Sequence, residues 1–145
     1  MGLDIGDRRI GVALSDPLGI MATPLTIVTR QNSEADMATM LGIIRQHDVS
    51  RIIIGLPLSM DGSHGPQAQK VRDFAAELGR HTDLPLEFED ERLSTVVAKR
   101  LVQTARKTDR STRYDAAAAA LILQSHLDGI AQVRELPEDY PPPDE

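Results

Sequence analysis

The sequence predicts one α/β domain, in which a mixed five-stranded sheet is flanked by helices in the order β-β-β-α-β-α-β-α-α. Three observations carry this prediction: apolar residues alternate with small or polar ones in the first part of the chain, a continuous β-branched run occupies 52–54, and later apolar residues recur at helical spacing. A length of 145 residues, with 41% apolar and 26% charged residues, suits a single globular domain.

The first three predicted elements are strands at 3–5, 10–14 and 24–29. The turn at Gly6-Asp7-Arg8-Arg9 is short, as is the connection before the third strand. Parallel neighbours need a long crossover, so these strands must form an antiparallel meander.

The remaining predicted elements alternate between helices and strands. They are a helix over 33–44, a strand over 52–54, a helix over 66–78, a strand around 86–88, a helix over about 94–103 and an alanine-rich helix over 115–130. The run at 52–54 is typical of a parallel strand buried on both faces. Two parallel strands added through right-handed crossovers to an antiparallel edge give the ribonuclease H-like topology.

Charge is distributed unevenly along the chain. The net charge is −6, but residues 135–145 hold five acids, no base and several prolines, and we expect this acidic Pro-rich tail to be disordered beside a folded domain over 1–134. Without the tail, 17 acids face 16 bases. The segment 92–113 contains seven basic residues and a single acid, Asp109, and forms a basic stripe in the sequence. The basic residues are Arg92, Lys99, Arg100, Arg106, Lys107, Arg110 and Arg113. The stripe is either a phosphate-binding surface or an ordinary solvated helix face.

Several classes of protein are excluded by composition. The absence of cysteine excludes disulfides, thiol catalysis and zinc–thiolate sites. There is no apolar run near 18 residues and no signal-peptide pattern at the start, so we expect a cytoplasmic protein with no membrane partner.

Asp4 is an unusual residue for its position. It interrupts the apolar strand Leu3–Ile5 and is flanked by Gly2 and Gly6. A carboxylate in a central strand is costly unless it is paired or bound to a metal, and the glycines leave room for a ligand to approach. The alternative is an aspartate that ends the strand and caps the following turn.

A second group of acids ends the fifth predicted strand, in the segment Glu87-Phe88-Glu89-Asp90-Glu91-Arg92. In open α/β sheets the ligand crevice lies beyond the carboxyl ends of the strands. Adjacent carboxylates repel each other, so the cluster indicates a nearby cation, unless it is a solvated strand end neutralised by Arg92. By alternation we expect Phe88 and Asp90 to point inward, but spacing does not decide which acid reaches the site.

Asp115 is the third candidate, at the predicted start of the last helix, where aspartate is also a favoured N-cap. Three carboxylates from distant segments, meeting at one sheet edge, would bind hard divalent cations such as Mg²⁺ or Mn²⁺. Two such ions can activate water and stabilise the leaving oxygen in phosphodiester hydrolysis. Arg106, Lys107, Arg110 and Arg113 would then hold the nucleic-acid backbone.

Four ordered segments resemble motifs of the YqgF (RuvX) family. They are Gly2-Leu3-Asp4-Ile5-Gly6-Asp7-Arg8-Arg9 continuing to Asp16, Ile53-Ile54-Gly55-Leu56-Pro57 continuing to Ser63, Asp90-Glu91-Arg92-Leu93-Ser94-Thr95, and Asp115-Ala116-Ala117 continuing to Ser125. The resemblance covers nearly the whole chain except the tail. Two features depart from the family pattern: only three residues precede Asp4, and the segment 108–114 differs from the usual Lys-rich loop.

The resemblance implies a ribonuclease H-like nuclease, related to Holliday-junction resolvases, that matures the 5′ end of pre-16S ribosomal RNA. It places Asp4, Glu91 and Asp115 on the family's acidic positions, as catalytic residues and metal ligands, and so selects Glu91 over Asp90. It also places Arg9 and Arg92 on basic positions that we assign to substrate phosphate or to holding the carboxylates. The expected partners are structured RNA and the assembling small ribosomal subunit.

Other functions stay open at this point. A four-way DNA junction is the rival substrate, and an enzyme that cuts it symmetrically would need to be a dimer. The sequence shows no heptad or self-complementary patch, and we expect a monomer or weak homodimer. A non-catalytic RNA-binding factor in ribosome assembly would use the same basic surface. Asp4-Ile5-Gly6 also resembles the phosphate loop of actin-like ATPases, but those proteins need two such domains and a far longer chain.

Overall fold

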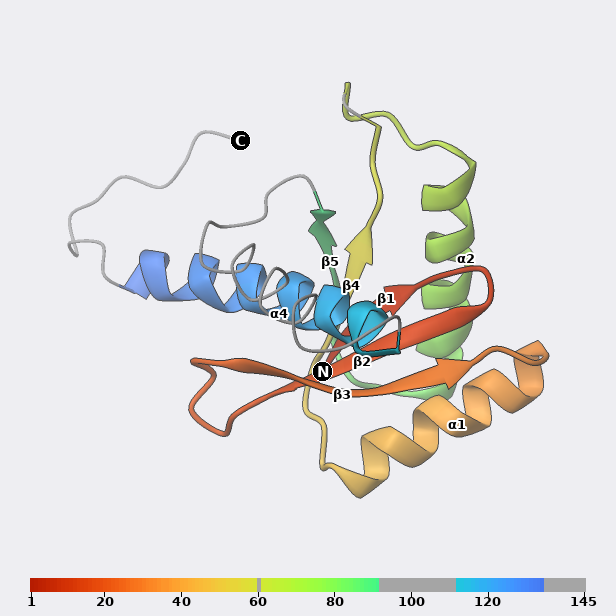
Figure 1. Ribbon diagram of the computed structural model, residues 1–145, viewed down its shortest axis with the longest axis horizontal. Coiled ribbons are helices and arrows are strands. Elements are labelled where there is room, and N and C mark those ends of the chain that lie inside the picture. Colours follow the sequence, from red (N-terminus) through yellow and green to blue (C-terminus); the bar gives the residue numbers. More distant parts are fainter. Residues whose placement is uncertain (60, 92–111, 135–145) are drawn as a thin grey trace.

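The computed structural model contains one mixed sheet, whose strands lie in the order β3-β2-β1-β4-β5 (Figure 1). The strands are β1 (Gly2–Ile5), β2 (Arg9–Ser15), β3 (Ala22–Thr29), β4 (Ile52–Leu56) and β5 (Leu86–Asp90), and the helices are α1 (Ser33–Gln46), α2 (Pro66–His81) and α4 (Thr112–Arg134). The structure describes residues 1–59, 61–91 and 112–134, with the side chains of α4 described from 116 to 130. The helix predicted over 94–103 and the predicted tail over 135–145 lie outside these residues.

The first three strands form the predicted antiparallel meander. β1 pairs with β2, and β2 pairs with β3. The turn between β1 and β2 is closed by a 2.9 Å hydrogen bond that the Gly6 backbone N–H donates to the Arg9 carbonyl. On its other side β1 pairs with β4 in parallel, and β4 pairs with β5 in parallel. The prediction of a mixed five-stranded sheet is therefore confirmed.

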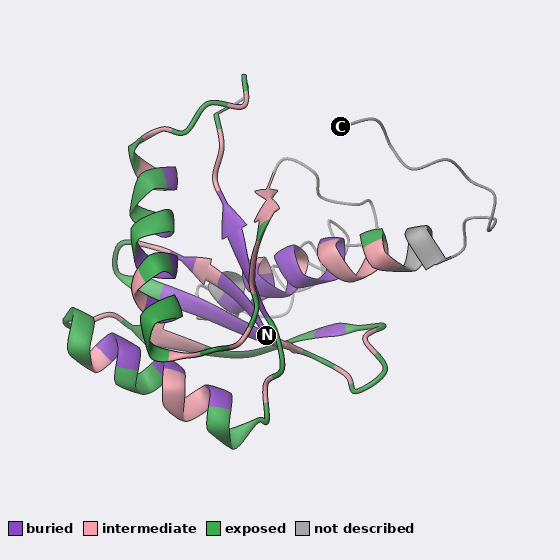
Figure 2. Cartoon of the chain, turned by 180° about the vertical axis from the view of Figure 1, so that it is seen from behind, coloured by how far each residue is buried: buried purple, intermediate pink, exposed green. Residues whose placement is uncertain are grey.

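Helices cover both faces of this sheet, as Figures 1 and 2 show. On one face α1 and α2 pack against Leu3, Ile52 and Ile54, all of which are completely buried. On the opposite face α4 packs against Ala13 and Ile53. All five residues of β4 are buried, as expected for a strand enclosed between two layers.

α4 approaches the sheet closely because small residues face each other at the contact. A Cβ atom at Gly2 would lie 2.7 Å from the Cβ of Leu123 and 2.9 Å from the carbonyl oxygen of Ala119, which is too close for any side chain. The buried alanines of this helix are Ala116, Ala117, Ala119 and Ala120. The alanine-rich segment is therefore the surface that brings α4 against β1 and toward Asp4.

The last helix starts earlier than the sequence analysis expected. The prediction placed its first residue at Asp115, whereas α4 begins at Thr112, so Asp115 lies within the first turn rather than at the N-cap. Aspartate is a favoured cap, but no glycine or proline separates Thr112 from Asp115, so the helix can begin before it. Among the described residues, none of the helices is both long enough and apolar enough to cross a membrane.

Candidate functional site

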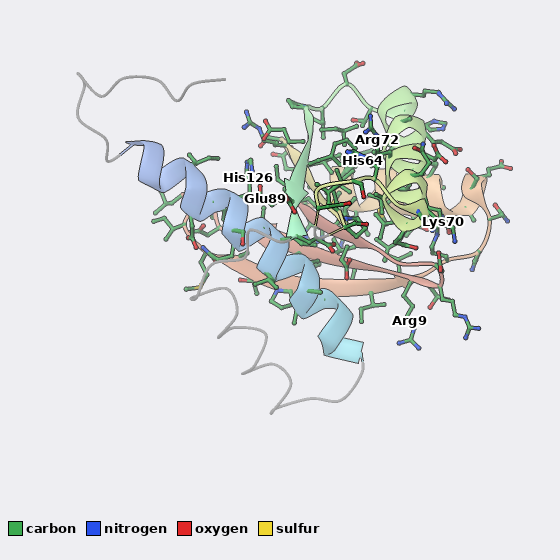
Figure 3. The ribbon with its side chains drawn as sticks, turned by 90° about the horizontal axis from the view of Figure 1, so that it is seen from above. Arg9, His64, Lys70, Arg72, Glu89 and His126 are labelled. Carbon is green, nitrogen blue, oxygen red and sulfur yellow. The ribbon has the colours of Figure 1, made fainter. Side chains whose placement is uncertain are left out.

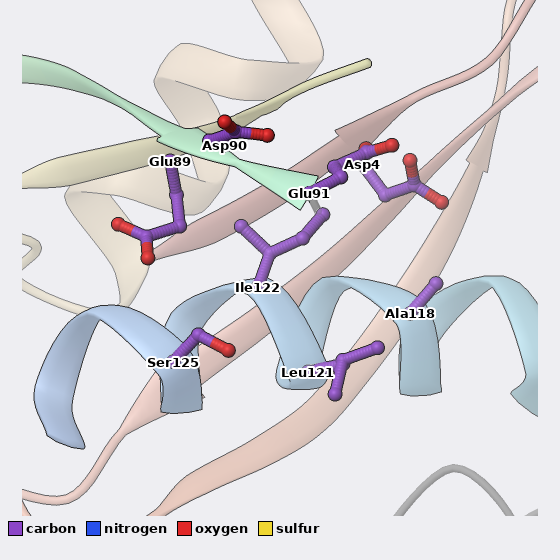
Figure 4. A pocket seen from close by; sticks show the side chains of 8 residues that line it. All are labelled: Asp4, Glu89, Asp90, Glu91, Ala118, Leu121, Ile122 and Ser125. Atoms are coloured by element: carbon purple, nitrogen blue, oxygen red, sulfur yellow. The ribbon is translucent and has the colours of Figure 1, made fainter. Parts of the chain in front are cut away.

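A cavity of about 200 Å³ lies between the carboxyl ends of β1 and β5 and the adjacent face of α4 (Figure 4). Eight residues line it: Asp4, Glu89, Asp90, Glu91, Ala118, Leu121, Ile122 and Ser125. β1 and β5 supply three of the acids, and the fourth, Glu91, directly follows β5, whereas the helix supplies small and apolar side chains with one hydroxyl. The carboxylates therefore face a wall that offers them few hydrogen-bond donors.

Asp4 reaches this cavity because of the alternation along β1. Its neighbours Leu3 and Ile5 are buried in the core beneath α1 and α2, so Asp4 projects toward α4. Its backbone is fixed on one side by pairing with Gly11 of β2, and Leu3 beside it pairs with Ile54 of β4. A half-buried carboxylate is thus held on a central strand, as the sequence predicts.

Glu91 follows the last residue of β5 and enters the same cavity, where Figure 4 shows it beside Asp4. Gly55 of β4 makes room for it. A Cβ atom at Gly55 would lie 2.7 Å from Glu91 Oε1 and 2.4 Å from the Cδ1 of Ile122. The glycine belongs to the Ile53–Ser63 segment noted in the sequence, but its role as space for the carboxylate was not predicted.

The cavity disfavours the ionised form of Glu91. Burial, and after it the negative charges of Asp4 and Asp90, raise the pKa of Glu91 from its usual 4.5 to about 7. A carboxyl group that keeps its proton near neutral pH lies in a site with excess negative charge and incomplete solvation. A cation in the cavity would offset both effects.

The backbone of Asp115 lies in the first turn of α4, three residues before Ala118. Ala118, one turn further along the helix, lines the cavity. Its side chain is outside the described residues. Among the side chains that are described, no group of three His, Cys, Asp or Glu residues could hold a metal ion.

The predicted basic residues are only partly placed. Arg9 is exposed at the start of β2 and does not line the cavity, and Figure 3 shows it well apart from Glu89. Arg113 lies in the first turn of α4, with its side chain outside the described set. The others lie outside the described residues: Arg92, Arg106, Lys107 and Arg110.

Glu89, Ser125 and His126 are site residues that sequence reasoning missed. It expected Phe88 and Asp90 to point inward, and the prediction for Phe88 is wrong, since Phe88 is 43% exposed. Glu89 lines the cavity instead, and its Oε2 lies 3.4 Å from the Nδ1 of His126 on α4. The signal was the spacing of Glu87, Glu89 and Glu91, whose alternation places them on the face toward α4.

Comparisons with known proteins identify the family and the fold of this chain. The sequence profile of the RuvX family, described as Holliday junction resolvase, matches residues 1–129. A protein of Moorella thermoacetica named "Putative pre-16S rRNA nuclease" is 47% identical over 134 residues, which cover 91% of this chain and 96% of that protein. A protein of a Ruegeria species with the same name is 47% identical over 137 residues, covering 92% of this chain and 87% of its own.

A solved structure of similar fold is RuvC of T. thermophilus in complex with a Holliday junction substrate. It matches with a TM-score of 0.62 at 13% identity, covering 90% of this chain and 93% of that one. At this identity the likeness concerns the fold, which is the predicted ribonuclease H-like one. The family profile and the identity to the curated relatives extend over nearly the whole described chain, and the chain therefore belongs to the RuvX family.

Proposed function

We propose that this protein is a metal-dependent nuclease that hydrolyses phosphodiester bonds during 5′-end processing of pre-16S rRNA. The observation that carries the proposal is the meeting of Asp4 and Glu91 in one cavity, where the pKa of Glu91 is raised to about 7. Membership of the RuvX family and the name of its curated relatives supply the reaction and the RNA substrate.

The donor set fits a hard divalent cation. Carboxylate oxygens are the ligands that Mg²⁺ and Mn²⁺ take in proteins, and the cavity brings two of them together with excess negative charge. Asp4, Glu91 and Asp115 would hold the ion, with Asp115 approaching from the first turn of α4. When bound, such ions supply Lewis-acid activation of water and stabilisation of the leaving oxygen.

The residues of the chain have separate tasks in this proposal. Asp4 is fixed on a central strand, so it provides the rigid reference for the site. Glu91 must release its proton to act as a ligand, so the affinity of the site for the metal ion falls below about pH 7. Leu121 and Ile122 exclude water from one wall of the cavity and strengthen the electrostatic interactions inside it.

Basic residues would hold the phosphates that flank the cut. We assign this role to Arg9, Arg92, Arg106, Lys107, Arg110 and Arg113, because phosphate contacts from Lys and Arg supply most sequence-independent affinity. Arg9 lies at the same end of the sheet as the cavity, since its hairpin follows directly after Asp4 and Ile5. The place of action is then the cytoplasm, on the assembling small subunit, with the protein acting as a monomer or weak homodimer.

Cleavage of a pre-16S 5′-leader transcript with Mg²⁺ or Mn²⁺ tests the proposal. Wild type should cut, and Asp4→Asn should lose at least about a hundredfold in rate, because it removes a ligand charge. Asp7→Asn is the matched control, since Asp7 is exposed in the same hairpin and pairs with Lys70 at 3.3 Å. Binding of Mn²⁺, followed by calorimetry, should weaken in Asp4→Asn and stay unchanged in Asp7→Asn.

A four-way DNA junction is the second candidate substrate, which the description of the family profile favours. A junction carrying the same label should be tested beside the leader transcript. Faster cutting of the junction, with symmetric nicks, would identify the DNA junction as the substrate instead of the RNA. A folded protein that binds the transcript, cuts neither substrate with either metal and binds RNA equally as Asp4→Asn would be an assembly factor and not a nuclease.

A further inference from the structure

Glu89 and Ser125 form a second polar region of the cavity, separate from Asp4 and Glu91. In Figure 4, Ile122 lies between the two regions, with Asp4 and Glu91 on one side of it and Glu89 and Ser125 on the other. Glu89 comes from β5 and Ser125 from α4, so this region is built where strand and helix face each other.

The Ser125 hydroxyl has no hydrogen-bond partner in the part of the chain that the structure describes. Ser125 is only 7% exposed, and its Oγ atom is buried without a hydrogen-bond partner among the described residues. Buried hydroxyls in native proteins are almost always hydrogen-bonded, to protein, water or ligand. A buried hydroxyl on a cavity wall, across from a carboxylate, is therefore suited to a ligand that both donates and accepts hydrogen bonds.

His126 holds Glu89 in place. The imidazole ring lies between two glutamates, with Nδ1 3.4 Å from Glu89 Oε2 and Nε2 3.3 Å from Glu87 Oε2, the latter without hydrogen-bond geometry (Figure 3 shows the Glu89 contact). The His126 side chain is 14% exposed and that of Glu89 18%. The Oε1 atom of Glu87 in turn lies 3.3 Å from the guanidinium of Arg51. The carboxylate of Glu89 is thus fixed from behind while it faces the cavity.

The side chains of this region limit the chemical class of ligand that it can bind. A carboxylate repels phosphate, so the region cannot hold the nucleic-acid backbone charge. A cation is disfavoured because this region offers one carboxylate, that of Glu89, whose Oε2 already lies 3.4 Å from His126 Nδ1. A sugar hydroxyl fits, because a carboxylate accepts the hydrogen bond that this hydroxyl donates, and a serine hydroxyl donates a hydrogen bond to its oxygen.

The position relative to Glu91 identifies which hydroxyl. Glu91 follows the last residue of β5 and is two residues from Glu89, so their Cα atoms are at most about 7 Å apart, and Glu89 lies within one nucleotide of a phosphate held at Asp4 and Glu91. The 2′-hydroxyl belongs to the ribose directly attached to that phosphate. This group alone distinguishes RNA from DNA at a given site.

We propose that Glu89 and Ser125 bind the 2′-hydroxyl of the ribose next to the scissile phosphate, with His126 as a positioning residue, so that the cavity selects RNA over DNA. The proposal rests on the nuclease function proposed above, because that function places the scissile phosphate at Asp4 and Glu91. It makes ribonucleic acid the preferred substrate class through residues on the cavity wall rather than through the basic surface.

The test compares binding of one single-stranded leader sequence made as RNA and as DNA, by fluorescence anisotropy. An Asp4→Asn background prevents cutting. We expect RNA to bind about tenfold more tightly than DNA, the effect of one hydrogen bond to a charged acceptor. Glu89→Ala should reduce the ratio to within about twofold, and Ser125→Ala should reduce it partly. Glu87→Gln is the matched control, since it contacts the same histidine but does not line the cavity, and should keep the tenfold ratio.

Structural damage is separated from recognition by the melting temperature. Ser125→Ala removes a buried hydroxyl that exchanges no hydrogen bond with any described residue, so the variant should be as stable as the parent or more so while its RNA preference falls. His126→Gln should also lower the preference, while leaving the Mn²⁺ affinity of a protein with intact Asp4 unchanged.

Equal binding of RNA and DNA by the parent, or an unchanged ratio in Glu89→Ala and Ser125→Ala, would overturn the proposal. So would a Mg²⁺ site that calorimetry finds in the parent and loses in Glu89→Ala while the RNA to DNA ratio stays constant. Failure of the proposed nuclease function is recognised separately, because it appears as absent cleavage by the protein with intact Asp4, whatever the binding ratio.

Discussion

Replacing Glu91 by glutamine should stabilise the metal-free protein at pH 8 and leave its stability unchanged near pH 4. At pH 4 the carboxyl is mostly protonated in both folded and unfolded states. Between 4.5 and about 7 the unfolded chain ionises while the folded protein retains the proton, so the wild-type free energy of unfolding falls as pH rises through this window. Above about pH 7 the loss is complete, and glutamine, which carries no charge, avoids it.

The magnitude follows from the size of the pKa change. A pKa raised from 4.5 to about 7 corresponds to about 3 kcal/mol for a fully buried group. Glu91 is only partly buried, and solvent screening reduces the effect to about 1–2 kcal/mol. In a domain of this size that difference raises the melting temperature by about 2–6 °C.

Urea denaturation of wild type and Glu91→Gln at pH 4 and pH 8, with a chelator present, measures the effect. Glu87→Gln serves as the control, because the Glu87 side chain is 41% exposed and lies outside the cavity. A Glu91→Gln variant less stable than wild type at pH 8 would refute the reasoning, since it would mean that the charged carboxylate is satisfied in the folded protein. Added Mg²⁺ should reverse the order, because it stabilises only the protein that retains the ligand.

Three further predictions concern the packing that builds the site. Gly55→Ala should displace the Glu91 side chain, lower stability by about 1–2 kcal/mol and weaken Mn²⁺ binding in calorimetry, because the added Cβ would lie 2.7 Å from Glu91 Oε1. Gln124→Leu should cost about 2–4 kcal/mol in urea denaturation, because this buried amide hydrogen-bonds two backbone groups around the start of β3 at 2.9 Å each. Asp36→Ala should cost about 3 kcal/mol in the same assay, because this 3%-exposed carboxylate accepts hydrogen bonds from Arg30 and from a backbone N–H. Unchanged stability of Gln124→Leu or of Asp36→Ala would contradict the contacts described for the replaced residue.

Much of the fold is predictable because periodicity reports burial directly. The apolar spacing of Val71, Phe74 and Leu78 predicts the buried face of α2, and all three are buried. The continuous run at 52–54 predicts a strand enclosed on both sides, which β4 is. These signals are local, so one sequence is sufficient to detect them.

The third strand shows where such a local signal fails. Alternation predicts that Leu25 and Ile27 share a face, but a register shift opposite Val12 and Ala13 leaves Leu25 without a partner in β2, and its side chain is 37% exposed. An irregularity of this kind depends on the neighbouring strand, so it is not visible in the residues of β3 themselves.

The candidate site, like the fold, is predictable from the sequence only in part. Asp4 stands out because a charge interrupts an apolar strand, whereas the orientation of β5 depends on which face meets α4. Edge strands tolerate an exposed aromatic residue, and Phe88 accordingly points away while Glu89 lines the cavity. The space that Gly55 leaves for Glu91, and the buried hydroxyl of Ser125, arise from contacts between distant segments and have no signature in the local sequence.

The central claim is that carboxylates around Asp4 would hold a divalent ion that RNA cleavage requires. The most direct test is the cleavage rate of the leader transcript measured against Mn²⁺ concentration. We predict a saturable rate for wild type, the same curve for Asp7→Asn, and no rate above background for Asp4→Asn at any concentration. Cleavage by Asp4→Asn at the wild-type rate, or cleavage by wild type that persists in excess chelator, would contradict the account.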